Sequence, residues 1–250
     1  MSLVAFCGDI HGNIDKMYRL LLEWEARTDL TLDAVVSVGD FGIFENIGDF
    51  PEYWKGRSRA PISTYVIVGN HENYELIRRW QRDPLFVANI QLIPDGEAVD
   101  VTGIRVGGVW GNYSPRSWND PKRVAFHRAG GNSNRIAAHI DKNACWKLCA
   151  AGYLNVLVTH DSAQATLPAE FRRPMDPALK QLLGLGKNEE AGGCPGFDTL
   201  LEKFQPPRYF FGHLHVRHDM QMGPTKVTCL QAIDYARGNG WFEVVDSESL

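Results

Sequence analysis

The sequence has little of several features that define specialised protein classes. Only five of its 250 residues are cysteines, and no two of them form a Cys-x-x-Cys pair, which argues against a zinc knuckle or a dithiol redox motif. The formal net charge is −4, so the chain lacks the overall positive field of a dedicated duplex-DNA-binding protein. Any affinity for a polyanion must therefore be local.

Long apolar runs are missing as well. No run reaches the length that spans a bilayer, and the stretch from Met1 to Cys7 turns polar too soon for a signal peptide. We therefore expect a cytoplasmic protein that has no membrane partner. Its cysteines are expected to be reduced and mostly structural.

What is present is an alternation of strand-like and helix-like segments. Continuous apolar runs predict strands at residues 3–7, 33–38, 62–68, 104–109, 154–158, 208–211, 226–230 and 241–245. Helical spacing predicts helices that begin near Asn13, which would act as an N-cap, and near residues 75 and 197. The alternation predicts the α/β class, and the strand-rich C-terminal third favours two packed sheets. We expect a two-sheet β-sandwich flanked by helices, formed by a single domain over residues 1–250.

Two stretches interrupt this pattern. Residues 111–142 and 162–195, with approximate limits, contain glycine and proline and show little periodicity. We interpret both as loop or lid insertions.

The first insertion is basic, although the chain as a whole is acidic. It carries six lysines and arginines against two aspartates, a local charge of +4. Such a charge attracts phosphate-bearing substrates, and the candidate substrate-binding residues are Arg116, Arg123 and Arg128. Its aromatic residues could stack a nucleobase, but a solvated loop with buried aromatics explains the same composition equally well.

Polar residues follow the ends of the strand-like runs. Asp9 and His11 lie two apart after the first run, so in an extended turn both side chains can face one ion. Asp40 follows the second run, and its carboxylate could bridge two cations. His213 and His215 repeat the two-residue spacing after a later run. Ligand sites in α/β folds gather at the carboxyl ends of strands, where all of these residues are expected.

Together these residues form a complete set of oxygen and nitrogen ligands. The seven candidate metal ligands are Asp9, His11, Asp40, Asn70, His160, His213 and His215. Without a thiolate, the set suits Mn²⁺, Fe²⁺, Zn²⁺ or Mg²⁺. Each motif alone is more often a helix cap or a core histidine, but five such motifs in series favour a site for two divalent metal ions.

The ordered motifs resemble those of the calcineurin-like metallophosphoesterase superfamily. They are Gly8-Asp9-Ile10-His11, Gly39-Asp40, Gly69-Asn70-His71-Glu72, Thr159-His160 and Gly212-His213-Leu214-His215. The resemblance implies a two-sheet α/β sandwich. It also implies that one metal ion is held by Asp9, His11, Asp40 and His215. The other would be held by Asp40, Asn70, His160 and His213.

The resemblance further implies a reaction and a catalytic residue. A water or hydroxide held between the metal ions would attack phosphorus while both ions neutralise the phosphoryl oxygens. His71 resembles the family's outer histidine, which steadies the phosphate and protonates the leaving oxygen. A structural role for His71 is the alternative, and Glu72 and Asp161 could orient imidazoles or be simple loop carboxylates.

Departures from the family motifs narrow the expected substrate. Asp40 is followed by Phe41-Gly42, without the Asp-Arg-Gly continuation of protein Ser/Thr phosphatases. No tyrosine ligand of the purple acid phosphatase type is found in this stretch. The Thr159-His160-Asp161 element and the 111–113 segment, together with the Gly-His-Leu-His motif, give a likeness to the RNA lariat debranching enzymes.

We therefore expect a metal-dependent phosphoesterase that cleaves a phosphodiester of a nucleotide or RNA. A phosphomonoesterase or phosphatase of the same fold is the first alternative. A non-catalytic protein scaffold is the second. The sequence makes no prediction of the native metal or of the oligomeric state.

Overall fold

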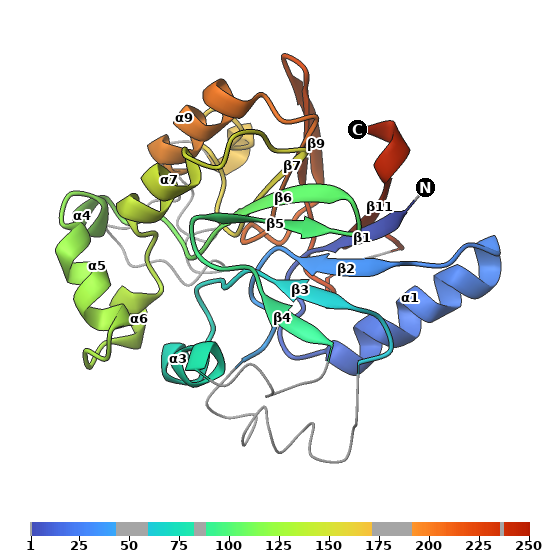
Figure 1. Cartoon of the computed structure of the whole chain (residues 1–250), viewed down its shortest axis with the longest axis horizontal. Helices are drawn as coiled ribbons and strands as arrows, with labels where there is room; N and C mark the ends of the chain where they lie inside the picture. Colours follow the sequence, from blue (N-terminus) through green and yellow to red (C-terminus); the bar gives the residue numbers. More distant parts are fainter. Residues whose placement is uncertain (1, 44–59, 83–88, 172–191, 236–237) are drawn as a thin grey trace.

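The fold is built on two mixed β-sheets packed face to face (Figure 1). The computed structural model describes residues 2–43, 60–82, 89–171, 192–235 and 238–250. The first sheet has the order β11 (Phe242–Asp246), β1 (Leu3–Cys7), β2 (Ala34–Ser37), β3 (Thr64–Val66) and β4 (Ile90–Leu92). β1 to β4 run parallel, and β11 is antiparallel to β1.

The second sheet has six strands. Its order is β5 (Glu97–Val101), β6 (Ile104–Val109), β7 (Val156–Thr159), β8 (Arg208–Phe211), β10 (Thr225–Cys229) and β9 (His218–Met222). The four inner strands are parallel, and the two edge strands pair antiparallel with their neighbours. The predicted α/β sandwich of two sheets is therefore confirmed.

Alternating side chains along the inner strands build two core layers. On β7, Val156 and Val158 belong to the core between the sheets, whereas Leu157 packs outward with the helices. The same alternation places Phe210 of β8 inward, where its ring stacks on Phe6 of β1 with centroids 4.4 Å apart. Such a pair adds about 0.5–1.5 kcal/mol beyond the burial of its area. Strands with both faces covered read as continuous apolar runs, which is why the sequence revealed them.

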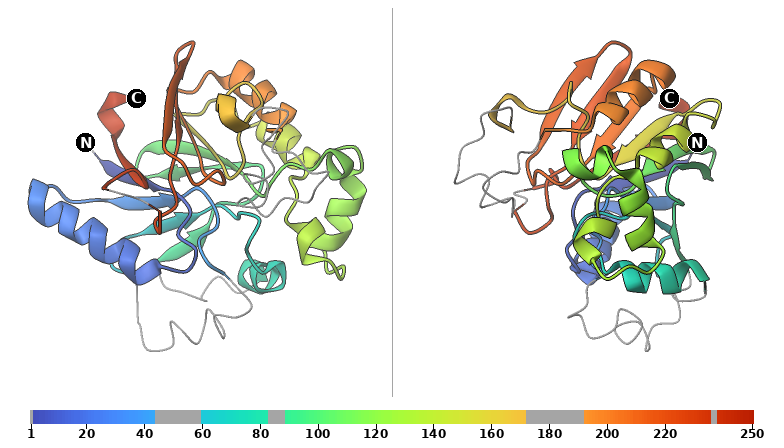
Figure 2. Two further views of the ribbon diagram at one scale, coloured as in Figure 1. Left: turned by 180° about the vertical axis from the view of Figure 1, so that it is seen from behind. Right: turned by 90° about the vertical axis from the view of Figure 1, so that its left-hand side faces the viewer.

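Helices cover the outer face of each sheet (Figure 2). Helix α1 (Ile14–Thr28) contributes Ile14, Met17 and Leu21 to the core of the first sheet. Helices α7 (Lys142–Leu148) and α9 (Pro195–Phe204) pack on the second sheet. Helix α3 (Tyr74–Arg82) follows the Asn70 loop. Among the described residues, no helix combines the length and the apolar character needed to span a bilayer.

Asn13 precedes α1 as predicted, but its side chain does not cap the helix. Its Nδ2 donates instead to the carbonyl of Ile10 at 3.0 Å and to Asp234 at 2.9 Å. A side-chain cap requires an oxygen that accepts from a helical amide, whereas here it is the side-chain nitrogen that bonds, to residues outside the helix.

The first insertion, which we interpreted as a loop or lid, contains short helices. Residues 111–142 contain α4 (Pro115–Trp118), α5 (Pro121–Arg128) and α6 (Asn134–Ala137). α4 and α6 have four residues each, too few to show periodicity, but proline starts α4 and α5, and the side chains of Asp120 and Ser133 cap α5 and α6. Of the second insertion, residues 172–191 lie outside the described residues, and its described part contains the 3₁₀ turn Ala169–Phe171.

A polar cluster around Glu243 ties β11 of the first sheet to the second sheet. The Glu243 carboxylate is 14% exposed and pairs with Arg208, with Arg217 at 2.6 Å and with Lys226 at 2.8 Å. Burial raises the pKa of Glu243, but these cations outweigh it and lower the pKa below its ordinary value. The ionised carboxylate is therefore favoured by the fold.

Replacing Glu243 by Gln is expected to lower the free energy of unfolding at pH 7 by about 1–3 kcal/mol, because three cations lose their shared partner. Since the folded pKa is the lower one, this stabilisation is present above the unfolded pKa of about 4.3 and is lost as pH falls through the folded value. Urea unfolding at pH 7 and pH 3 measures the difference. Glu97→Gln is the matched control, since the pair of Glu97 with Lys147 is exposed. Equal stability of the two variants at pH 7 would contradict this account.

Candidate metal centre

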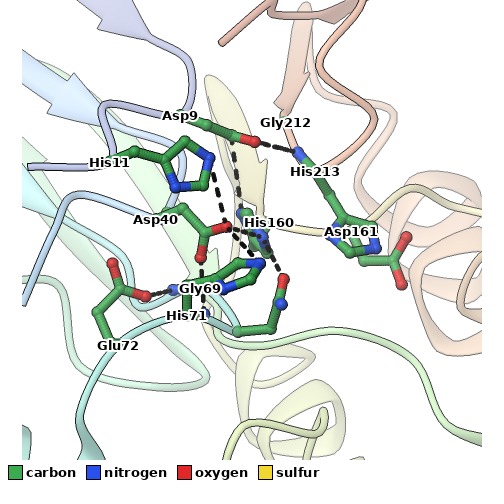
Figure 3. A network of polar contacts seen from close by, with 12 residues as sticks. Asp9, His11, Asp40, Gly69, His71, Glu72, His160, Asp161, Gly212 and His213 are labelled. Carbon is green, nitrogen blue, oxygen red and sulfur yellow. Dashed lines mark hydrogen bonds and ion pairs between the residues drawn. The ribbon is translucent and has the colours of Figure 1, made fainter. Parts of the chain in front are cut away.

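Strand ends from both sheets bring the seven predicted ligands to one edge of the sandwich. Figure 3 shows Asp9, His11, Asp40, His160 and His213 at this edge. Asp9 and His11 follow β1, Asp40 follows β2 and Asn70 follows β3. His160 follows β7 in the second sheet, and the Gly-His-Leu-His motif follows β8. Because these strands are parallel within each sheet, their carboxyl ends share an edge.

Four ligand residues form a compact group. One ligand atom from each of Asp9, His11, Asp40 and His215 lies within 4.8 Å of the others. The Nε2 of His215 is 3.1 Å from Oδ2 of Asp9 and also 3.1 Å from Nε2 of His11. Two carboxylates and two imidazoles converging in this way can hold a divalent cation.

A second group shares Asp40 with the first. The Nε2 of His160 lies 3.3 Å from Oδ2 of Asp40 and 2.8 Å from Oδ1 of Asn70. The ring of His213 lies beside that of His160, with centroids 5.1 Å apart, while its backbone nitrogen donates to Oδ2 of Asp9 at 2.9 Å. Asp40 therefore lies close to members of both groups.

The ligand loops have unusual backbone conformations. His11, Asp40, His213 and His215 all have positive φ, between 47° and 65°. Such conformations cost of order 1–3 kcal/mol for a residue other than glycine, and they persist where the surrounding structure enforces them. Strain shared by four predicted ligands supports a functional arrangement of these loops.

The glycines that precede the ligands are required by close approach. A Cβ on Gly69 would lie 2.2 Å from Oδ1 of Asp40, and one on Gly212 would lie 2.0 Å from Oδ1 of Asp9. Any side chain at either position would push a carboxylate out of the site. The Gly-Asn and Gly-His pairs of the motifs therefore have a steric cause.

The electrostatics of the site fit divalent cations. Oδ2 of Asp40 is buried and has no hydrogen-bond partner among the described residues. Burial alone would raise the pKa of Asp40, but the nearby imidazoles hold it well below its usual range. For His160, burial lowers the pKa, yet the carboxylates of Asp40 and Asp9 raise it to about 10. A buried carboxylate oxygen that accepts no hydrogen bond, in a site that favours positive charge, is what a metal ion would neutralise.

Glu72 and Asp161 bind backbone amides. Glu72 is buried and accepts from the amides of Gly69 at 2.7 Å and Gly42 at 3.3 Å, which joins the Asn70 loop to the Asp40 loop. Burial and the charge of Asp40 raise the pKa of Glu72 to about 8. Asp161 accepts from the amides of Ser162 and Tyr113, both at 2.7 Å, and lies beside His213 (Figure 3). Both carboxylates shape the ligand loops.

His71 lies at the open side of the centre. Its side chain is 55% exposed, and its Nε2 is 4.0 Å from Oδ2 of Asp40. Its backbone amide donates to Oδ1 of Asp40 at 2.9 Å, and this hydrogen bond fixes the position of His71 relative to Asp40. An exposed imidazole beside the ligand groups can reach a bound substrate.

The three arginines expected to bind substrate are placed differently from one another. Arg128 pairs with Asp95 and donates to the carbonyls of Ala137 at 2.9 Å and His139 at 2.8 Å. Its position therefore does not support the expected substrate role, because its guanidinium is committed to the fold. Arg116 on α4 is exposed and Arg123 on α5 is half-buried, and no contact among the described residues joins either to a predicted ligand.

Tyr235 borders the centre although no motif indicated it. Its ring stacks on that of His215 with centroids 5.5 Å apart, and the residue is 57% exposed. The loop that carries it is held to the site by the amide of Ile233, which donates to the carbonyl of Asp9 at 3.0 Å. This neighbour lies 226 positions after Asp9, so no local signal in the sequence could reveal it.

Sequence comparison finds lariat debranching enzymes among the relatives of this chain. The chain is 22% identical over 264 residues to a lariat debranching enzyme of Entamoeba histolytica, covering 96% of this chain and 72% of the relative. It is 25% identical to lariat debranching enzyme A of Xenopus laevis, covering 98% of the chain and 50% of the relative. For the human lariat debranching enzyme the identity is 25%, with 86% and 42% covered. The chain thus spans about half the length of most of these relatives.

Solved structures share the fold at low sequence identity. The TT1561 protein of Thermus thermophilus superposes with a TM-score of 0.57 at 12% identity, over 98% of this chain and 99% of that one. A dimetal phosphatase from Danio rerio superposes with a TM-score of 0.50 at 11% identity, over 92% and 87%.

Residues 2–217 match the sequence model of the calcineurin-like phosphoesterase family. The match includes every motif that carries the resemblance, from Gly8-Asp9 to His215. The family uses a pair of divalent metal ions, and the candidate site around Asp40 has the donors for one. The chain therefore belongs to the calcineurin-like phosphoesterase family and is a metal-dependent phosphoester hydrolase.

Proposed function

We propose that this hydrolase cleaves phosphodiesters, with a nucleotide or RNA as substrate and two divalent metal ions as cofactors. The observation that carries the proposal is the pair of ligand groups that meet at Asp40, whose buried Oδ2 has no hydrogen-bond partner among the described residues. The lariat debranching enzymes among the relatives support an RNA substrate.

The residues divide between the two ions according to their positions. Asp9, His11, Asp40 and His215 would hold one ion, and Asp40, Asn70, His160 and His213 the other. Mn²⁺, Fe²⁺, Zn²⁺ and Mg²⁺ all suit these donors. Bound divalent ions supply Lewis acidity toward the phosphoryl group and the attacking water.

The protein's own groups complete the reaction. His71, exposed beside Asp40, protonates the leaving oxygen as it departs. Asn70 contributes a neutral oxygen, which limits the negative charge that an anionic substrate meets. Backbone donation from His213 to Asp9 and from His71 to Asp40 fixes the two carboxylates before substrate binds.

A diester is favoured because the sequence that follows Asp40, Phe41-Gly42-Ile43-Phe44, carries no arginine that could clamp a monoester. The residue after Asp40 is Phe41, which is fully buried and presents no charge to a phosphate. A monoester dianion carries one more negative charge than a diester and gains more from an arginine clamp. Loss of that clamp therefore disfavours monoesters selectively.

Assay of the purified protein with Mn²⁺ on bis(p-nitrophenyl) phosphate and p-nitrophenyl phosphate tests the proposal. We expect kcat/KM for the diester to exceed that for the monoester by about tenfold or more, which corresponds to about 1.4 kcal/mol in transition-state binding. A preference for the monoester would replace the diesterase proposal by a phosphatase of the same fold.

A further inference from the structure

The helices α4 to α6, here called the helical lobe (residues 113–140), are hydrogen-bonded to two loops of the second ligand group, those that carry His160 and Asn70. The amide of Tyr113 donates to Oδ2 of Asp161, next to His160. At the other end, Asn134 accepts from the amide of Tyr74 at 2.8 Å and donates to the carbonyl of Glu72 at 3.1 Å. The lobe therefore flanks the centre and is fixed to it (Figures 1 and 2).

Much of the charge and aromatic surface of the lobe is used internally. Arg128 is held by Asp95 and two carbonyls. Trp118 packs against Tyr113 with ring centroids 6.1 Å apart, and a Cβ on Gly196 of α9 would lie 2.3 Å from its ring. These residues hold the lobe on the domain, and both aromatic rings are half-buried in these contacts.

One face of α5 is left with cations and an aromatic ring. Phe126 is 66% exposed, and it follows Lys122 by four residues and Arg123 by three, which places all three side chains on the same helical face. Within the described ranges, neither cation forms an ion pair, and the nearby Asp120 caps α5 by accepting from the Arg123 amide. Arg116 on α4 adds a further exposed cation.

An exposed phenylalanine among unpaired cations fits a strand of nucleic acid. Cations neutralise successive phosphates, and an aromatic ring offers a stacking platform for an unpaired base. A duplex would hide its base faces from Phe126, so the occupant is single-stranded.

We propose that this α5 face, with Lys122, Arg123 and Phe126, docks a single strand of polynucleotide outside the catalytic centre. This proposal rests on the proposed function, since the strand is the continuation of a substrate whose scissile phosphodiester lies at the metal centre. The surface then acts only on substrates long enough to reach it. A small diester gains nothing from it.

The test compares the triple variant Lys122→Ala, Arg123→Ala, Phe126→Ala with a matched control on α1. The control, Arg19→Ala, Leu22→Ala, Arg27→Ala, likewise removes two cations and one exposed apolar side chain. Fluorescence anisotropy measures binding of labelled 20-nucleotide single-stranded RNA and DNA of one sequence. With Mn²⁺, kcat/KM is measured on the same oligonucleotides, on dinucleotides and on bis(p-nitrophenyl) phosphate.

We expect the α5 variant to bind the oligonucleotide about 10- to 100-fold more weakly than the control variant. The slope of log K against log salt should also fall in magnitude by about 1.4, since two phosphate contacts are lost. kcat/KM on the oligonucleotide should decrease in proportion, with a far smaller change on the dinucleotide. The single variant Phe126→Tyr should retain most of the binding that Phe126→Ala loses, because tyrosine keeps the stacking ring.

Weaker binding of RNA, DNA or both by the α5 variant supports the proposed docking surface. Which of the two nucleic acids loses affinity shows whether the surface accepts ribose, deoxyribose or both. Wild-type affinity and an unchanged salt slope in the α5 variant would overturn the proposal that this face binds a polynucleotide. A protein partner would then be the alternative occupant. Failure of the wild-type protein to cleave any diester would instead contradict the proposed function. The two failures are distinct, because the anisotropy measurement does not require turnover.

Discussion

Replacing Asp40 by Asn is expected to lower kcat/KM on a phosphodiester by about a thousandfold or more. Asp40 is the one carboxylate that stands in both ligand groups, and Asn removes its charge while keeping its shape. The amide oxygen can still accept from the His71 backbone, so the loop is expected to stay folded. The rate loss therefore reports the missing charge between the two cation sites, where Lewis-acid activation requires it.

The matched control for Asp40 is Asp234→Asn. Asp234 is 47% exposed and contacts Lys16 and Asn13 beside the centre, but it belongs to neither ligand group. Metal content by mass spectrometry and thermal melting accompany the kinetics of both variants. An Asp40→Asn protein that keeps wild-type turnover and metal content would refute the bridging role. The Asp234→Asn protein should keep both.

The second large effect concerns the leaving group. His71→Asn is expected to reduce kcat by about 10²- to 10⁴-fold on a dinucleotide, whose departing alkoxide needs a proton. On bis(p-nitrophenyl) phosphate the loss should be far smaller, because p-nitrophenolate leaves without protonation. Rates on a series of aryl and alkyl diesters give the dependence on leaving-group pKa, which should steepen in the variant.

His218→Asn provides the comparison for His71, since His218 lies on β9 away from the ligand groups. It should leave the leaving-group dependence unchanged. Equal losses on all diesters after His71→Asn would indicate that the residue holds the phosphate or the Asp40 loop without donating a proton. The hydrogen bond from the His71 amide to Asp40 is the contact through which His71 would hold the Asp40 loop.

Whether a strand could be predicted from the sequence depends largely on its position in the sheet. β1, β2, β6, β7 and β8 are internal strands with continuous apolar runs, and all were predicted. β4, β5 and β9 were not predicted, and each is an edge strand, whereas β11 is an edge strand that was predicted. The burial of β9 alternates between half-buried and exposed residues, because an edge strand is only partly covered. Without a continuous apolar run, such a strand reads as a loop.

The candidate site was predictable where its residues are tied to strand ends. Asp9, Asp40 and His160 each follow a buried strand directly, so the sheet order brings them together. What the sequence could not provide are contacts made across the chain. Glu72 joins two ligand loops through their amides, and Arg128 bonds Asp95, 33 positions away. Those partners depend on packing that no local pattern encodes.

The short helices are the other elements that the sequence did not predict. α4 and α6 have four residues each, too few for a helical period to repeat. Composition therefore suggested an irregular basic insertion, and the structure replaces it with a lobe whose α5 face carries the remaining charge. The residues proposed to bind substrate change accordingly. The sequence suggested three arginines in a loop, and the structure favours one face of α5 around Phe126.

The central claim, a two-metal diesterase centred on Asp40, is tested most directly by titrating metal-depleted protein with Mn²⁺. Bound Mn²⁺ and diesterase rate are followed together, with electron paramagnetic resonance to detect coupling between the ions. The account predicts that about two equivalents bind, that turnover requires both and that the coupled signal is lost in Asp40→Asn. Full turnover by the metal-depleted protein, or saturation at a single uncoupled ion, would contradict it.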